Sequence, residues 1–455
     1  MHVHSAMSSG MYTLPELTRI ATNYGLDAIF LSDSLVESIQ YGLPPLRHMF
    51  WFGRDNRSVM RDGPESFLEA VARENARQTD VLYIPGVEIT PRFHWTGSWL
   101  TGDLTCRNHQ RNLIALGTDS AKLIRGIPVT AGYARGIHPV WRWTTLTLLV
   151  LFGLAFLFTL FGAPVLARRS RFPTGELRRC LLIGILAPLL LIMIALHILA
   201  SRNPDFDLYS ADQPARFEQR TLDYLTRHHI PCFWAHPEAS DLHTFGLAGL
   251  KITIRTDPYP EILRQTTNYI GFAGVNEGRN DLILPESAWD TLLRQSLTDP
   301  RRRPVWCFGE MLYHYEGQAG KKMGNVQTMV WADRREPSAL LDAIRAGRLY
   351  ARRNSDTQSL TLETWQAGNG FSGERVRADG PRVPIRLAVS ARVSGARLAV
   401  KVLRNGHPIL QETLAAPIRL EFDDEPPSGA PVYYRALAIG DQPVKLVTNP
   451  IFVDR

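Results

Sequence analysis

The chain has 455 residues, 45% of them hydrophobic, which is enough to bury a core and by length predicts two or three domains. Its net charge is +7, but the arginines are dispersed or flank apolar segments without an aromatic-basic motif, so we expect no nucleic-acid partner. The four cysteines show neither Cys-x-x-Cys spacing nor a disulfide framework, and they indicate no cellular compartment.

The chain begins with a pair of possible metal ligands, His2 and His4. Side chains alternate along a strand, so two histidines two residues apart point the same way and lie close enough to share one ion. The following residues predict a short helix, with Thr13 as its cap, Pro15 in its first turn and Gly25 as its stop.

Polar residues then follow apolar strands at several places. The run 26–31 predicts a strand that ends next to Asp33, and the run 230–235 predicts another that ends at His236. Glu88 lies in a similar segment and can bridge two ions. Strands followed by polar side chains are how a β/α barrel builds its site. These residues therefore predict a metal site made of separate pieces of the chain.

The ordered motifs are His-x-His-Ser at 2–5, Gly-Leu-Asp-Ala-Ile-Phe-Leu-Ser-Asp at 25–33, Ile-Pro-Gly-Val-Glu-Ile at 84–89 and Ala-His-Pro at 235–237. This set resembles the PHP (polymerase and histidinol phosphatase) family of metal-dependent hydrolases. The resemblance implies an α/β fold with a distorted (β/α)7 barrel.

The resemblance also implies a set of metal ligands. His2, His4 and Glu88 would hold a first ion, and Glu88 would bridge to a second ion held by His236 and one further histidine. Two histidines are candidates for that last ligand. His109 is favoured over His94 because it precedes an apolar strand.

Several positions depart from the family pattern. Where the family places ligands of a third metal, this chain has Ser9 and Ser34, and neutral hydroxyls are poor ligands for zinc or manganese. We therefore expect two ions, zinc or manganese. His314 fits the last histidine of the family, but the aspartate position before it is Leu312, and Glu310 could reach in from the same loop.

Two uncharged runs, 143–167 and 180–201, are each long enough to cross a bilayer, and they predict a transmembrane hairpin over 141–201. The connecting segment 168–179 holds five arginines, which predicts a cytoplasmic loop. The hairpin would then be an insertion between two barrel halves, 1–140 and 202–355. We expect a bacterial inner-membrane protein with the lipid bilayer as a partner and a periplasmic catalytic domain.

This topology requires residues 1–142 to cross the membrane, although they carry no signal peptide. A barrel strand is also expected before His2. One explanation covers both points, namely a start further upstream that supplies the first strand and an export signal. The competing explanation is a cytoplasmic barrel whose hairpin loop departs from the charge rule.

The end of the chain predicts a change of structure. A short amphipathic helix ending at Gly347 and a strand at 349–351 are expected to close the barrel. Alternating strands separated by turns then predict a C-terminal β-sandwich over 356–455. These strands are expected at 385–389, 397–403, 418–422 and 432–438.

The expected function is a membrane-anchored hydrolase, and more specifically a phosphoesterase, in which two metal ions activate a shared water. Glu88 and Asp33 are the candidate catalytic residues, and Asp33 is equally suited to anchoring the end of its strand. The alternative, motivated by Ser9, Ser34 and Leu312, is a degenerate barrel that binds a ligand or partner in the envelope without turnover. A transporter is disfavoured because the two apolar runs hold no carboxylate or lysine.

Overall fold

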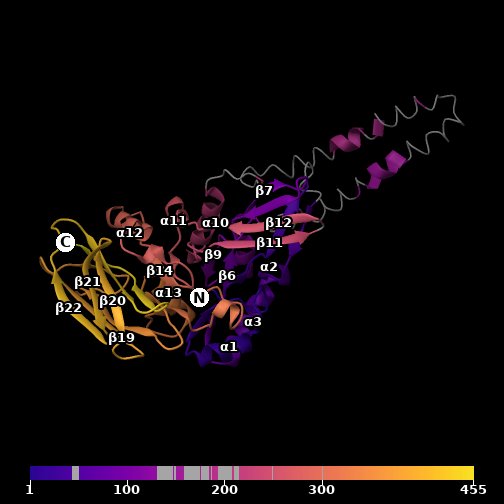
Figure 1. Ribbon diagram of the computed structural model, residues 1–455. Helices are drawn as coiled ribbons and strands as arrows, with labels where there is room; N and C mark the ends of the chain where they lie inside the picture. Colours follow the sequence, from indigo (N-terminus) through magenta and orange to yellow (C-terminus); the bar gives the residue numbers. More distant parts are fainter. Residues whose placement is uncertain are drawn as a thin grey trace. The chain divides into compact units, whose positions relative to one another are not determined.

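The structure of the protein is a computed structural model (Figure 1). The structure describes residues 1–43, 51–130, 215–247, 249–299 and 301–454, and between 131 and 214 it describes residues 147, 150–157, 175, 184–185, 187–192 and 208–209. The chain divides into two compact units. The first comprises residues 1–37, 56–129 and 211–455, and the second comprises residues 38–55 and 130–210.

The first unit is built around a six-stranded mixed sheet with the order β14-β13-β10-β9-β6-β2. Strand β9 is antiparallel to both of its neighbours, β6 and β10, and the other pairs are parallel. The strands are β2 (Asp33–Ser34), β6 (Gly86–Ile89), β9 (Leu113–Leu116), β10 (Cys232–Trp234), β13 (Gly271–Val275) and β14 (Trp306–Gly309). All their residues are buried, as expected for strands covered on both faces.

Helices alternate with these strands along the chain, and they contribute many residues to the hydrophobic core. They are α1 (Leu14–Asn23), α2 (Val59–Asp62), α3 (Pro64–Arg77), α4 (Ala121–Gly126), α10 (Arg216–Arg227), α11 (Ile262–Gln265), α12 (Ala288–Thr298) and α13 (Pro337–Arg345), with 3-10 helices η3 (Asp281–Ile283) and η4 (Gln318–Gly320). Helix α1 confirms the first predicted helix. The Glu16 carboxylate accepts a hydrogen bond from the Thr13 amide at 2.8 Å at its start, and Gly25 follows its end with a φ of +64°.

The structure also contains smaller sheets that are separate from the six-stranded one. Strand β1 (Ala28–Phe30) pairs with β5 (Leu82–Ile84) in parallel. A four-stranded sheet has the order β11-β12-β8-β7 and consists of β7 (His94–Ser98), β8 (Asp103–Arg107), β11 (Asp241–Leu247) and β12 (Leu250–Thr256), three of which are labelled in Figure 1. In the second unit, β3 (Ser38–Gly42) and β4 (Trp51–Asp55) form a hairpin, and the Gly42 amide donates to the Tyr209 hydroxyl at 2.7 Å.

The C-terminal part holds an eight-stranded and a three-stranded sheet. Their strands are β15 (Val326–Val330), β16 (Leu349–Arg353), β17 (Leu360–Ala367), β18 (Arg375–Arg377), β19 (Val383–Ala391), β20 (Arg397–Arg404), β21 (His407–Ala415), β22 (Ile418–Asp424), β23 (Val432–Ile439), β24 (Lys445–Thr448) and β25 (Ile451–Asp454). The four strands predicted from their alternating pattern are all present, as β19, β20, β22 and β23. Residues of these strands form a second hydrophobic core, which includes Trp365, Leu387, Val400 and Tyr434.

The predicted fold class, a distorted (β/α)7 barrel with a membrane hairpin and a β-sandwich, is wrong. The described residues form a mixed α/β structure with several separate sheets and no closed barrel. A barrel of alternating strands and helices needs parallel neighbours throughout, whereas β9 runs antiparallel. Strand β16, which was expected to close the barrel, pairs instead with β15 and β24 of the eight-stranded sheet.

The predicted transmembrane hairpin and the inner-membrane localisation also need correction. None of the helices in the described parts of the chain is long and apolar enough to span a membrane. A span requires about 20 consecutive helical residues. The two predicted runs, 143–167 and 180–201, fall mostly outside the described residues.

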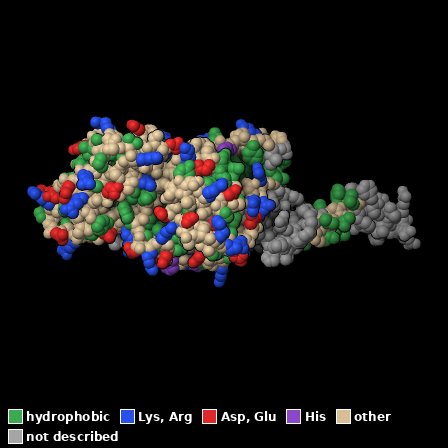
Figure 2. Space-filling view, turned by 90° about the horizontal axis from the view of Figure 1, so that it is seen from below, with side chains coloured by type: hydrophobic (Ala, Val, Ile, Leu, Met, Phe, Trp, Pro, Cys, Tyr) green, Lys and Arg blue, Asp and Glu red, His purple; other side chains and the backbone are tan. Residues whose placement is uncertain are grey.

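Charged side chains are spread over the face of the molecule that Figure 2 shows. On the face shown in Figure 2, lysine and arginine side chains alternate with aspartate and glutamate side chains. The net charge of +7 is therefore not gathered into one basic patch on that face.

Candidate metal centre

The first four residues lie between two other segments of the chain. Val3 forms bridges with Leu31 on one side and Tyr313 on the other. The His4 amide donates to the Tyr313 carbonyl at 3.0 Å, and the Tyr313 amide donates to the His2 carbonyl at 3.1 Å. Both histidines are completely buried and face the same interior region, although the left-handed φ of His2 departs from the regular strand on which the predicted alternation of side chains was based.

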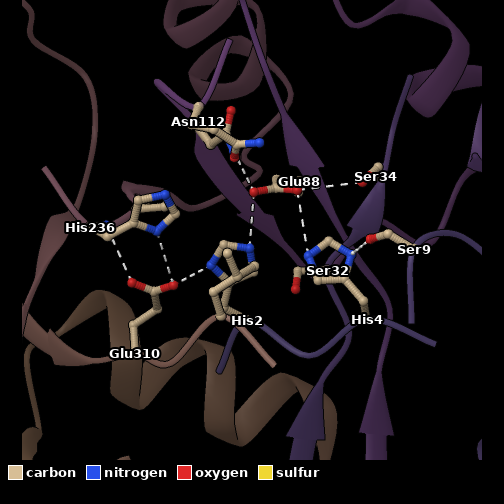
Figure 3. Close-up of polar contacts among 12 residues, drawn as sticks. His2, His4, Ser9, Ser32, Ser34, Glu88, Asn112, His236 and Glu310 are labelled. Atoms are coloured by element: carbon tan, nitrogen blue, oxygen red, sulfur yellow. Dashed lines mark hydrogen bonds and ion pairs between the residues drawn. The ribbon is translucent and has the colours of Figure 1, made fainter. Parts of the chain in front are cut away.

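Glu88 lies opposite both imidazoles (Figure 3). The distance from His2 Nε2 to Glu88 Oε1 is 3.0 Å, and that from His4 Nε2 to Glu88 Oε2 is 3.4 Å. One ligand atom from each of these residues lies within 4.8 Å of the others, so together they could hold a metal ion. Glu88 lies on strand β6, which is buried along its whole length, so its side chain is held in the interior next to the two histidines.

The hydrogen bonds of the two histidines indicate which ring nitrogens are free. His2 Nδ1 contacts Glu310 Oε1 at short range, and His4 Nδ1 lies 3.2 Å from the hydroxyls of both Ser8 and Ser9. The two Nε2 atoms are buried and have no hydrogen-bond partner among the described residues, although they face the Glu88 oxygens. Occupied Nδ1 atoms favour the tautomer whose Nε2 lone pair is available to a metal. The residues present therefore fit a metal ion.

A second group of possible ligands shares His2. It contains His2, His236 and Glu310, again with ligand atoms within 4.8 Å of one another. The Glu310 carboxylate accepts a hydrogen bond from the His236 amide at 3.2 Å and lies 3.4 Å from His236 Nδ1. His236 follows β10 and Glu310 follows β14, so two separate strand ends of the sheet supply this group.

Burial and opposite charges shape the ionisation of these groups. Burial opposes the ionisation of Glu88 and Glu310, but the positive charge of His2 holds the pKa of each carboxyl well below its usual range. In the metal-free protein burial likewise opposes protonation of His2, but Glu310 and Glu88 raise its pKa to about 9, so a metal ion that binds Nε2 would displace a proton from this ring. For His4, burial dominates and lowers the pKa well below its usual value. Two buried carboxylates thus require nearby positive charge, which a divalent cation would also supply.

Two of these residues have an unusual backbone conformation. His2 has a φ of 71° and His236 a φ of 27°, in the left-handed region that residues with a side chain seldom adopt. Such conformations persist only where surrounding interactions hold them, and they cluster at functional sites. Here they occur in the only two residues that contact Glu310 through a ring nitrogen within the described part of the chain.

Glu88 also has two polar neighbours that are not ionised. Asn112 Nδ2 donates to Glu88 Oε1 at 2.5 Å, and Ser34 Oγ donates to Glu88 Oε2 at 3.4 Å. Sequence reasoning did not select Asn112. The available signal was its position directly before β9, the strand beside β6. Ser9 and Ser34, which the family resemblance placed at the positions of third-metal ligands, both hydrogen-bond to members of the first group.

Asp33 lies behind the first group rather than within it. Its carboxylate accepts hydrogen bonds from the Ser5 amide and the Ser5 hydroxyl, both at 2.8 Å, and from the Ser8 hydroxyl at 2.5 Å. The Ser8 hydroxyl in turn contacts His4 Nδ1. Burial raises the pKa of Asp33 despite these hydrogen bonds. This arrangement suits the anchoring role that the sequence left open.

We expect Asp33→Asn to weaken metal binding by about tenfold without abolishing it, because changes to residues that orient a ligand cost about 10- to 100-fold in affinity. Isothermal titration calorimetry of the metal-free protein with zinc or manganese would measure the change in metal affinity. Unchanged affinity would show that the Ser5 and Ser8 hydrogen bonds do not position His4.

The remaining predicted histidines lie outside both groups. The His314 ring stacks on His4 with centroids 4.7 Å apart and rings 12° from parallel, and its Nδ1 lies 3.2 Å from Gln318 Oε1. The His109 ring packs against Phe93 with centroids 5.7 Å apart. Burial is the main cause that lowers the pKa of His94 to about 4. Neither His109 nor His94 is brought to the described ligand groups, so the further histidine ligand stays a prediction.

Replacing these histidines one at a time distinguishes the ligand groups seen in the structure from the ligand set that the sequence predicted. We expect His236→Ala to lower the metal content of the protein by about one ion per chain, whereas His109→Ala and His94→Ala leave it unchanged, because only His236 belongs to a ligand group. Elemental analysis of the three purified variants would measure this. A loss of metal in His109→Ala equal to that in His236→Ala would favour the ligand set expected from the sequence.

Comparison of the sequence with protein-family models finds no match, and comparison with curated proteins finds none either. The family resemblance of the motifs is therefore a prediction, and the function is argued below from the site.

Proposed function

We propose that this protein is a metal-dependent hydrolase that acts on phosphoesters. One observation carries the proposal: two buried imidazole Nε2 atoms, from His2 and His4, face the Glu88 carboxylate and have no hydrogen-bond partner among the described residues. Buried polar groups almost always have a partner, so two buried imidazole nitrogens that face one carboxylate without a hydrogen bond fit a cation-binding site. The motif resemblance to PHP hydrolases supports the same reaction class.

Imidazole and carboxylate ligands suit zinc and manganese. We propose that His2, His4 and Glu88 hold a first ion and that His236 and Glu310 hold a second. The two ligand groups support a count of two, because they present two separate carboxylates. Bound divalent cations would act as Lewis acids. They would lower the pKa of a bound water molecule and offset negative charge on the phosphoryl group.

The surrounding residues prepare the site for this chemistry. Asn112 and Ser34 hold the two oxygens of Glu88, so the carboxylate is fixed before a ligand arrives. Ser8 and Asp33 fix His4, and Glu310 fixes His2. Such preorganisation avoids a reorganisation cost in the transition state. Burial of both histidines and Glu310 keeps bulk water from these contacts.

Elemental analysis of the purified full-length protein tests the proposal. We expect about two zinc or manganese ions per chain, and their loss in a His2→Ala/His4→Ala variant. Hydrolysis of p-nitrophenyl phosphate should depend on the same ions and stop with a chelator. A folded protein that binds no metal when zinc or manganese is added would overturn the proposal.

A second candidate function is a binding module without turnover. The observation that favours it is the loop after β14, where the sequence has Leu312 at the family's aspartate position and where His314 stacks on His4 outside both ligand groups. Metal binding without hydrolysis of phosphate, carboxylic or carbamate esters would support this candidate over the hydrolase.

A further inference from the structure

A chain of hydrogen bonds leads outward from Glu88 and ends at the side chain of Gln110. Asn112 Nδ2 donates to Glu88 Oε1 at 2.5 Å, a contact drawn in Figure 3, and to Gln110 Oε1 at 3.1 Å. Gln110 Oε1 is therefore no further from Glu88 Oε1 than these two bonds together reach. His2 Nε2 lies 3.0 Å from the same Glu88 oxygen. A single residue thus separates Gln110 from the first ligand group.

The carboxylate at the inner end of this chain fixes which atom each amide presents. An ionised carboxylate only accepts hydrogen bonds, so Asn112 turns its donor, Nδ2, toward Glu88. The same nitrogen faces Gln110, which must therefore present its oxygen to Asn112. Asn112 Oδ1 accepts from the Thr90 hydroxyl at 2.8 Å, which agrees with this orientation. The two N–H donors of Gln110 Nε2 are consequently not used by Asn112.

These two donors are available to a ligand. Gln110 Nε2 has no hydrogen-bond partner within the described part of the chain. Gln110 is half-buried, and solvent reaches its Nε2. Its backbone is held on both sides, because the amide donates to the Thr256 hydroxyl at 3.0 Å and the carbonyl accepts from the Tyr259 hydroxyl at 3.5 Å. A donor on a fixed backbone is preorganised for a bound molecule.

We propose that Gln110 Nε2 donates a hydrogen bond to a phosphoryl oxygen of the substrate when the substrate lies against the first ligand group. Asn112 and Ser34 donate to Glu88 itself, whereas the Gln110 amide nitrogen is left for the substrate. Phosphoryl oxygens are charged acceptors, and hydrogen bonds to charged groups are stronger than those between neutral groups. This inference rests on the proposed function for its reaction, but the binding of inorganic phosphate can be measured separately.

Isothermal titration calorimetry with inorganic phosphate on the full-length, metal-loaded protein tests this role. Gln110→Met keeps the length of the side chain and removes both its donors and its acceptor. Gln110→Glu keeps an acceptor for Asn112 and removes the donors. We expect the Kd for phosphate to rise about fivefold in Gln110→Met, which loses one hydrogen bond, and about tenfold or more in Gln110→Glu, whose new carboxylate also repels the anion.

Two further measurements separate a contact with phosphate from indirect effects. Metal affinity reports the position of Glu88, and Gln110→Glu should bind zinc or manganese at least as tightly as the unaltered protein does. Phosphate titration at about 1 M salt, where the Debye length is about 3 Å, screens the repulsion. A loss of affinity that persists in Gln110→Glu, relative to the unaltered protein in the same salt, then reports the missing donor.

The matched control is Gln327→Met. Gln327 on β15 is also half-buried, and its Oε1 also accepts a hydrogen bond, from Arg352 Nε at 2.8 Å. Because this amide contacts an arginine and no member of the ligand groups, the variant should leave the Kd for phosphate unchanged.

The outcomes keep this role apart from the proposed reaction. A Kd within twofold of the unaltered protein in Gln110→Met, a loss in Gln110→Glu that vanishes at high salt, or no phosphate binding at all would overturn the role of Gln110. A lasting loss in Gln110→Glu with metal affinity retained supports it. If phosphate binding depends on Gln110 while the metal-loaded protein hydrolyses no phosphoester, the proposed hydrolase fails and the phosphate contact stands.

Discussion

Glu88→Gln is expected to remove the first metal ion, about one ion per chain, and to lower hydrolysis of p-nitrophenyl phosphate by about a thousandfold or more, equivalent to about 4 kcal/mol of transition-state stabilisation. The two Glu88 oxygens face the unsatisfied Nε2 atoms of His2 and His4. Glutamine keeps the size of the side chain but presents an uncharged amide, which is a poor metal ligand. Elemental analysis and steady-state kinetics on the same preparation would measure both effects.

A matched control is Glu74→Gln. Glu74 is also buried and also hydrogen-bonded, to Arg77 at 2.7 Å and to Thr18 at 2.7 Å, but it belongs to neither ligand group. We expect this variant to lose stability and to keep its metal. Full metal content in Glu88→Gln would show that the two histidines bind without the carboxylate, and it would remove the main support for the first ion site.

Arg435→Ala is expected to destabilise the protein by about 3 to 5 kcal/mol, because removal of one partner of a buried ion pair leaves the other charge uncompensated. Arg435 on β23 and Asp290 on α12 are fully buried and joined by two hydrogen bonds of 2.8 and 2.7 Å. The Arg435 guanidinium also donates to the Ile283 and Leu284 carbonyls and lies 4.5 Å from the centre of the Trp289 ring. These contacts tie the eight-stranded sheet to the helices of the first core.

Denaturant unfolding followed by circular dichroism would measure this loss. The control is Arg386→Ala, which removes an exposed ion pair with Glu421 of nearly the same length, 2.8 Å, and should cost less than about 1 kcal/mol. The double variant Arg435→Met/Asp290→Leu should recover much of the loss because it removes both charges. A loss in Arg435→Ala as small as that in Arg386→Ala would mean that the buried pair does not join the two parts.

The sequence by itself determined the local features of this protein. The pattern of Thr13, Pro15 and Gly25 predicts α1, and alternation predicts the four C-terminal strands, because caps, turns and side-chain periods act over a few neighbouring residues. The same local rule predicts that His2 and His4 face one way. Glu88 and His236 were selected because each lies at or beside a buried strand, and the structure brings both to ligand groups.

Only the tertiary structure decided how these pieces combine. The antiparallel direction of β9, the pairing of β16 with the C-terminal sheet and the absence of a closed barrel among the described residues depend on contacts between distant segments. Glu310 reaches His2 across 308 positions of sequence, and Asn112 reaches Glu88 across 24. No local pattern carries that information, because hydrogen bonds between distant residues are set by packing of the whole core. The same reason explains why His109 suited the sequence pattern and yet lies outside both ligand groups.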